Sequence, residues 1–303
     1  MAHDIAKIQG RTSASEVETA DAPRLVLSTR RRWNLRLIVG LAIIILATGS
    51  ALAAPWISPY TAEEQVLSSR LQGPTASHLL GTDNFGRDIL SRVIWGGRVS
   101  LAVGLLAMSI AVSVGVLVGT TSGYFGRVVD AVLMRITELV LVFPAFFLLI
   151  LAVATFGRTL TVLILMLGLT SWAVSARIIR GEVLKVKQRD YILAAQSIGA
   201  TNTRIIARHI LPNIASVIIV SATIRVGVLI LVEAGLSFLG LGIQQPQPSW
   251  GNMIADSVPF ISQIWWFTLF PGLAIFITVL GFNLMGEGLR DLLDPRQGKG
   301  RAV

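Results

Sequence analysis

Apolar residues in this chain form long uninterrupted blocks instead of alternating with polar residues. A helix rises about 1.5 Å per residue, so roughly 20 apolar residues cross a hydrocarbon core about 30 Å thick. Only helices and closed barrels satisfy their backbone hydrogen bonds within lipid, and runs without alternation favour helices. The pattern predicts an all-α polytopic membrane protein with six transmembrane helices, at about Leu35–Ala54, Ser100–Ser122, Leu139–Ala154, Leu160–Ala176, Ile214–Leu236 and Trp265–Leu284.

Composition agrees with this pattern. Of the 303 residues, 53% are hydrophobic and 14% are charged, whereas soluble domains carry about 25% charged residues. We expect a mostly disordered N-terminal tail (1–33), a six-helix transmembrane domain (34–286) and a C-terminal tail (287–303). The transmembrane domain includes an outer segment (55–97) and a polar loop (178–212).

The net charge of +9 is unevenly distributed. Lys and Arg residues gather before the first block, between the fourth and fifth blocks, and after the sixth, whereas residues 241–263 contain none. Basic residues mark the cytoplasmic side of membrane proteins, so both termini and the loop 178–212 are predicted to be cytoplasmic. Because these residues flank apolar blocks, they favour anionic lipid head groups as partners, and we expect no nucleic-acid binding.

The first block has some features of a cleaved signal peptide. Arg30–Arg32 precede it, and Ala51–Ala53 supply small residues near its end. However, its apolar run of about 20 residues exceeds the usual 7–15, and a long polar tail comes before it. We therefore expect an uncleaved transmembrane helix.

The loop after the fourth block carries the sequence DYILAAQSIGATNTRIIARHILPN, residues 190–213. Its pattern predicts a helix over about 182–198, with Leu184, Tyr191, Ala195 and Ile198 on one face. Gly199 breaks that helix, and Thr201 or Asn202 caps a second one that ends at Pro212. The small residues of the loop permit close approach by a partner protein. The alternative is a solvated amphipathic loop bound to lipid, and the residues alone do not decide between the two.

Two further features concern helix geometry. Pro144 is predicted to kink the third span, because proline removes a backbone donor. The stretch His78–Leu101 predicts a short interfacial helix that introduces the second span, with Asp88 and Arg92 paired four residues apart. His78 has no suitably spaced second ligand, and the chain contains no cysteine, so we expect neither a metal site nor a disulfide.

Arg225 and Glu233 lie within the fifth block. Charges at this depth are costly and usually face the protein interior. Eight residues separate them, about two turns on one face, so they are predicted either to line a translocation path or to pair with neighbouring helices. Trp250, Trp265 and Trp266 are predicted to anchor the outer interface.

The loop sequence resembles the EAA loop of ABC importer permeases, specifically those of the dipeptide/oligopeptide/nickel family. Leu193 stands where the general pattern has Glu, and His209 where it has Ile, as is familiar in the peptide branch. Four other stretches resemble blocks of the C-type subunit of this family, and they cover most of the chain after the tail: residues 78–101, 123–137, 236–254 and 282–296.

The resemblance implies the type I ABC importer permease fold in a bacterial cytoplasmic (inner) membrane. It implies a heterodimer with a B-type permease, two ATPase subunits that use ATP and Mg, and an extracytoplasmic solute-binding protein. The chain itself is expected to bind no cofactor and to be no enzyme, because it lacks the phosphate-binding motif GxxxxGK[ST]. The implied cargo is a dipeptide or oligopeptide. Nickel chelates, glutathione, opines and oligosaccharides are the alternatives.

The resemblance also assigns roles to residues. Those expected to dock the ATPase are Tyr191, Ala194, Ala195, Ser197, Gly199, Ala200, Leu211 and Pro212. Arg225 and Glu233 are candidates for the pore, where Arg225 could meet a peptide carboxylate. Candidates for contact with the binding protein are Gln245, Pro246, Pro248 and Trp250.

Two other functional classes lack the residues that they would need or leave the polar loop unexplained. An intramembrane protease would need paired Asp residues within the spans or a zinc motif such as HExxH, and the sequence has neither. An ATP-independent secondary transporter would not need the small-residue docking loop. Dependence of transport on ATP separates that class from an importer.

Overall fold

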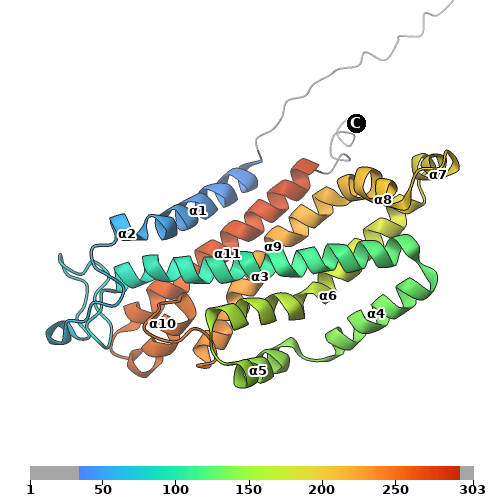
Figure 1. The fold of residues 1–303 in the computed structure, drawn as a ribbon. Coiled ribbons are helices and arrows are strands. Elements are labelled where there is room, and N and C mark those ends of the chain that lie inside the picture. Colours follow the sequence, from blue (N-terminus) through green and yellow to red (C-terminus); the bar gives the residue numbers. More distant parts are fainter. Residues whose placement is uncertain (1–33, 294–303) are drawn as a thin grey trace, which may run out of the picture. The chain divides into compact units, whose positions relative to one another are not determined.

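The computed structural model describes residues 34–293. The predicted N-terminal tail and the last ten residues of the C-terminal tail lie outside this range. The described residues form helices and loops, without a β-strand beyond one isolated bridge between Thr82 and Asp88. The helices (Figure 1) are α1 Leu35–Leu52, α2 Ala54–Ile57, η1 Leu67–Ser69, α3 Ile89–Phe125, α4 Arg127–Val142, α5 Ala145–Phe156, α6 Leu160–Lys187, α7 Asp190–Ser197, α8 Asn202–Ile205, η2 Ile206–Ile210, α9 Leu211–Phe238, α10 Trp250–Ser257, η3 Val258–Phe260 and α11 Trp265–Leu293.

Five helices of the described part are long and apolar enough to cross a membrane, and a bent pair brings the number to six if it counts as one span. The five are Leu35–Leu52, Ile89–Phe125, Leu160–Lys187, Asn202–Phe238 and Trp265–Leu293. The all-α polytopic fold class is thereby confirmed. The last helix continues to Leu293, beyond residue 286, where the transmembrane domain is predicted to end.

The bent pair is α4 and α5, which meet at an angle of 82°. The break lies at Phe143 and Pro144, in agreement with the predicted kink. Helix already runs from Arg127, before the predicted start of this span at Leu139. Gly126, with φ +64°, separates α4 from α3.

Helix α3 is one continuous helix of 37 residues, so the separate interfacial helix predicted before the second span does not exist. The predicted pair of Asp88 with Arg92 is also wrong. Asp88 caps the helix by accepting a 2.8 Å hydrogen bond from the Ser91 amide, and it lies 3.0 Å from Nδ1 of His78. Arg92 instead donates to the Ala62 carbonyl and lies near Asp83.

Close packing between α3 and α6 depends on three glycines spaced four residues apart, Gly115, Gly119 and Gly123. A Cβ atom at Gly119 would lie only 2.5 Å from the Ala176 carbonyl oxygen. Small residues at this spacing let membrane helices approach at backbone distance. The two helices therefore pack along the stretch that leads to the polar loop.

The other long helices complete the packing of the described part. Helix α1 lies beside α11, and α9 packs against both α3 and α11 (Figure 1). Their core includes Leu101 of α3, Val226 and Ile230 of α9, and Phe282 of α11. Helix α9, which continues from the polar loop, is thus held against α3 and α11.

Candidate functional site

The polar loop begins where α6 ends at Lys187 and continues as α7, a turn and α8. Gly199 forms the turn with φ +82°, a conformation that favours glycine. Thr201 caps α8, since its hydroxyl accepts a 3.4 Å hydrogen bond from the Arg204 amide. The predicted helix–turn–helix is thus present, but its first helix starts at Asp190 instead of about residue 182.

The predicted end of the second helix at Pro212 is wrong. Helix runs without interruption from Asn202 to Phe238, through α8, the π-helical turn Ile206–Ile210 and α9. Proline at this position cannot donate to the carbonyl four residues earlier, and a π turn is one way a helix absorbs such a defect. Asn213 donates a 2.6 Å side-chain hydrogen bond to the His209 carbonyl beside it.

The loop is held by a hydrophobic cluster of buried side chains. Ile192 of α7 and Ile205 of α8 are fully buried, and they pack with Ile179, Val183, Val186, Ile210 and Ile214. The face predicted for the first helix is wrong, because Ile198 is 86% exposed whereas Ala195 is buried. The break after Lys187 starts a new helix, so residues on either side do not share one helical phase.

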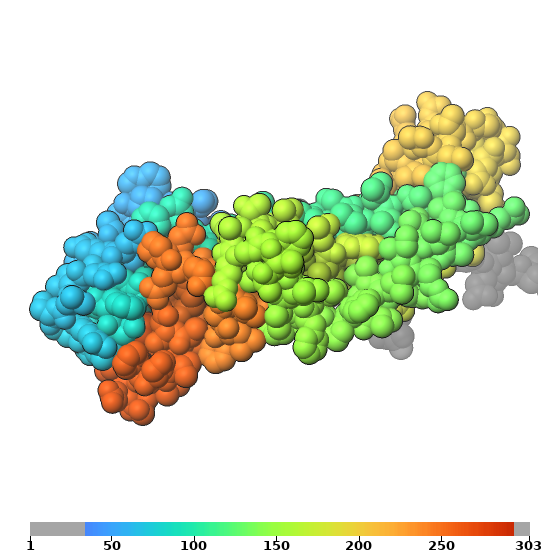
Figure 2. Space-filling model, turned by 60° about the horizontal axis from the view of Figure 1, so that its bottom comes forward, coloured from blue at the N-terminus to red at the C-terminus, as the bar shows by residue number. Residues whose placement is uncertain are grey.

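The remaining loop residues form an exposed surface, which Figure 2 shows in gold at the end of the molecule away from α10. Of the residues predicted to dock an ATPase, Ala195 is buried, and Ala200 and Leu211 are half-buried. The exposed ones are Tyr191, Ala194, Ser197, Gly199 and Pro212. Leu193 and Ile198, which the sequence interpretation did not include, add apolar area to this surface.

Tyr124, near the end of α3, contacts this loop, and sequence reasoning missed it. Its hydroxyl donates a 2.8 Å hydrogen bond to Oδ1 of Asn202, the first residue of α8. Its carbonyl accepts a 2.5 Å hydrogen bond from Nζ of Lys187, which also lies 5.5 Å from the centre of the Tyr124 ring. The ends of α3 and α6 and the start of α8 therefore meet at one buried residue.

A second polar contact ties α4 to α6 near the loop. Arg180 donates to both carboxylate oxygens of Asp130, from Nε and Nη2, at 2.5 Å each. Ser122 of α3 also donates to Asp130. Such a bidentate pair has a defined geometry and is stronger than a neutral hydrogen bond.

Glu233 is fully buried within the described part of the chain. It accepts hydrogen bonds from Ser100 of α3 at 3.1 Å and from Ser237 at 2.7 Å. Ser100 in turn accepts a 3.2 Å hydrogen bond from the Trp250 amide of α10. The carboxylate therefore joins three helices and lines no open path in this structure, which favours the structural alternative.

Arg225 lies half-buried near the middle of α9. Among residues 34–293 it makes no hydrogen bond or ion pair, and it is not paired with Glu233. Its role in a pore stays a prediction.

The outer loop between α9 and α10 is only partly exposed. Gln245 and Pro246 are exposed, whereas Pro248 and Trp250 are buried. Trp250 donates a 2.9 Å hydrogen bond from Nε1 to the Val93 carbonyl and packs on Gly97. Its prediction as an interface anchor is therefore wrong, and Pro248 and Trp250 are not available as surface contacts. Trp265 is 60% exposed.

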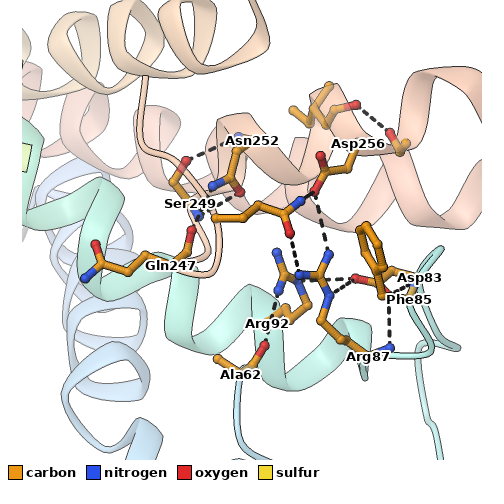
Figure 3. Close-up of polar contacts among 12 residues, drawn as sticks. Ala62, Asp83, Phe85, Arg87, Arg92, Gln247, Ser249, Asn252 and Asp256 are labelled. Atoms are coloured by element: carbon orange, nitrogen blue, oxygen red, sulfur yellow. Dashed lines mark hydrogen bonds and ion pairs between the residues drawn. The ribbon is translucent and has the colours of Figure 1, made fainter. Parts of the chain in front are cut away.

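Figure 3 shows how this loop is joined to the outer segment. Arg87 donates from Nε to Asp83 at 2.6 Å and from Nη1 to Gln245 at 2.7 Å. Asp256 of α10 accepts a 2.6 Å hydrogen bond from Gln245 and lies 3.7 Å from Nη2 of Arg87. Burial raises the pKa of Asp256, and the positive charges of Arg92 and Arg87 oppose that rise.

Two family models match the chain. The family described as "Binding-protein-dependent transport system inner membrane component" matches residues 111–299. The family described as "N-terminal TM domain of oligopeptide transport permease C" matches residues 34–74.

Curated relatives match over most of their length. The dipeptide transport system permease protein DppC of Alkalihalophilus pseudofirmus is 42% identical over 278 residues, which cover 92% of this chain and 91% of the relative. The oligopeptide transport system permease protein OppC of Bacillus subtilis is 38% identical, covering 89% and 88%. The glutathione transport system permease protein GsiD of Pectobacterium atrosepticum is 40% identical, covering 88% of each chain. Together with the helical fold, these matches show that the chain belongs to the family of binding-protein-dependent transport system inner membrane components and is a multi-pass protein of the inner membrane.

Proposed function

We propose that this chain is the C-type permease subunit of an ABC importer for short peptides. It would pair with a B-type permease, two ATPase subunits and an extracytoplasmic solute-binding protein, with both of its own termini in the cytoplasm. The observation that carries this proposal is the exposed surface of α7 and the Gly199 turn, built on a buried cluster between two transmembrane helices.

The surface is suited to a protein partner. The small side chains of Ala194 and Ser197, together with Gly199, allow a partner to approach the backbone closely. Leu193 and Ile198 supply apolar area that is exposed in this chain without its partners. Exposed apolar patches rimmed by polar residues are typical of interaction sites. An ATPase groove that receives α7 would cover these side chains.

The loop is also positioned to transmit movement of the ATPases to the transmembrane helices. When ATP binding closes the two ATPases, a docked α7 moves with them. The Tyr124 contact carries that displacement to α3, and the continuous helix from Asn202 carries it to α9. Hydrolysis of ATP, with its Mg, takes place in the partner subunits.

The cargo follows from the relatives. Those described above are named for dipeptides, oligopeptides and glutathione, which is itself a tripeptide. What they share is a short peptide, so we assign the same class of cargo to this chain. Nickel chelates, opines and oligosaccharides remain outcomes of the test below.

The test is purification of the tagged chain from its native membrane in mild detergent, followed by reconstitution. We expect a second permease and ATPase subunits to co-purify, and a binding protein to carry a peptide. Proteoliposomes containing that complex should take up the peptide only when ATP is supplied. Recovery of the chain alone as a stable homo-oligomer, or uptake that is independent of ATP, would overturn the proposal.

A further inference from the structure

A pocket of about 590 Å³ opens where the outer segment, the start of α3, the start of α6 and the outer loop meet. Figure 2 shows the outer segment in blue beside the orange outer-loop region, with yellow-green residues around α5 and the start of α6 next to it. The lining residues that matter here are Glu63, Trp95, Arg98, Val99, Leu160 and Gln247. Pockets of a few hundred Å³ are typical of small-molecule sites.

The pocket contains one acidic and one basic side chain, and neither has an ion-pair partner among residues 34–293. Glu63 comes from the outer segment. Arg98 comes from α3, and its guanidinium lies 5.1 Å from the Trp95 ring. Both charged side chains are exposed. Opposite charges in one small pocket, unpaired with each other, suit a ligand that carries both charges.

One more polar side chain in the wall is without a partner. The Gln247 side chain is exposed, makes no hydrogen bond in the described part of the chain, and extends away from the arginine cluster in Figure 3. A free amide beside apolar Val99 and Leu160 resembles the lining of a peptide site more than that of a site for a bare ion.

The backbone on both sides of the pocket is firmly held. Buried Arg92 donates a 3.1 Å hydrogen bond to the Ala62 carbonyl, next to Glu63. Asn252 donates a 2.8 Å hydrogen bond to the Gln247 carbonyl. These contacts fix the positions of both walls, and the side chains of Glu63 and Gln247 make no hydrogen bond among residues 34–293, so they can bind a ligand without breaking one.

We propose that this pocket binds a short peptide with free termini, with Arg98 at its carboxylate and Glu63 at its ammonium group. The inference rests on the proposed function, since it assigns a receiving site at the predicted outer end of a peptide importer. Gln247 would bind a peptide-bond carbonyl or amide, and Val99 and Leu160 would contact its side chains.

The test uses the absence of cysteine from this chain. Val99→Cys places a single thiol in the pocket, and Leu79→Cys places one on the exposed outer segment away from it. The reconstituted importer is treated with a membrane-impermeant thiol reagent, with and without a millimolar dipeptide and without binding protein. Labelling of this chain is followed by mass. We expect the dipeptide to slow labelling at residue 99 at least threefold and to leave residue 79 unaffected.

Capped peptides and charge variants then identify the contacts. Amidation of the dipeptide and Arg98→Gln should each remove most of the protection, and so should N-acetylation and Glu63→Gln. Glu64→Gln and Arg70→Gln, which change exposed charges outside the pocket, should preserve it.

Two results would overturn the inference: labelling at residue 99 that the dipeptide does not slow, or no labelling there while residue 79 reacts. ATP-dependent uptake by the unmodified importer is measured in the same preparation with binding protein present. This control separates failure of the proposed pocket from failure of the proposed function. Normal peptide uptake without protection refutes only this site, whereas absence of uptake for every peptide refutes the proposed function.

Discussion

The hydroxyl of Tyr124 donates a 2.8 Å hydrogen bond to Oδ1 of Asn202, although 78 residues separate the two in the chain. Tyr124 ends the buried part of α3, and Asn202 begins the helix that continues into α9. The proposed ATPase-docking loop is thus attached to a helix to which it is not connected in sequence.

Tyr124→Phe removes this hydrogen bond and leaves the ring in place. We expect a loss of about 1 kcal/mol in the free energy of unfolding, as for an ordinary hydrogen bond. More ATP should be hydrolysed per peptide transported, because the loop moves less tightly with α3. Tyr60→Phe is the matched control, since that hydroxyl bonds to the Ser77 carbonyl in the outer segment. An unchanged ratio of ATP to peptide in Tyr124→Phe would contradict the role of the contact.

Gly199→Asp and Gly199→Asn form a second pair of variants. Both side chains tolerate positive φ, and a Cβ at Gly199 has open space around it. Any loss of co-purifying ATPase that the two variants share reflects a change in the turn itself. The carboxylate of Asp adds a charge to the docking surface, so less ATPase should co-purify with Gly199→Asp than with Gly199→Asn. Equal recovery of ATPase would show that this turn is not at the interface.

Gly119→Ala tests the close packing of α3 on α6. The new methyl group would lie 2.5 Å from the Ala176 carbonyl oxygen, so we expect destabilisation of about 1–3 kcal/mol. Gly181→Ala is the control, because beyond its own stretch of helix backbone no described atom lies within 4 Å of its Cβ position, and alanine favours helix by up to about 1 kcal/mol. The midpoint temperature of thermal unfolding in detergent should fall for Gly119→Ala and rise for Gly181→Ala.

Asp256 gives a prediction about pH. Because its pKa in the folded chain is raised above the ordinary 3.8, the folded state binds more protons than the unfolded state just above that pH. Stability contributed by this group therefore falls as the pH rises through the window between the two values. Asp256→Asn should show a shallower decline of its unfolding midpoint across that window. Equal slopes for the variant and the unmodified protein would contradict the effect of burial.

The sequence predicted the transmembrane helices well where long apolar runs dominate, as in α1 and α9. It misplaced the start of α3, because Arg92, Gly96, Gly97 and Arg98 interrupt the apolar run while the helix continues through them. Tertiary contacts explain this, since Arg92 is buried against Asp83 and Ala62, and Gly97 packs on Trp250.

In the proposed docking loop, too, local sequence signals predicted some features, whereas features that depend on tertiary contacts were missed. Gly199 and Thr201 signal their turn and cap directly, and both predictions are confirmed. The break after Lys187 has no glycine or proline to mark it, so the phase of α7 could not be read from spacing. The Tyr124 contact depends on how α3 meets α8, which no local pattern encodes.

The uninterrupted helix from Asn202 to Phe238 makes one rigid rod of 37 residues, about 55 Å from end to end. A tilt of roughly 10° about one end would displace the other by about 10 Å. The π-helical turn before Pro212 is the irregular stretch of this helix, so its stiffness decides how much of a displacement at the polar loop reaches Glu233. The helix would then work as a lever, and the π-helical turn would determine how far its far end moves for a given displacement of the loop.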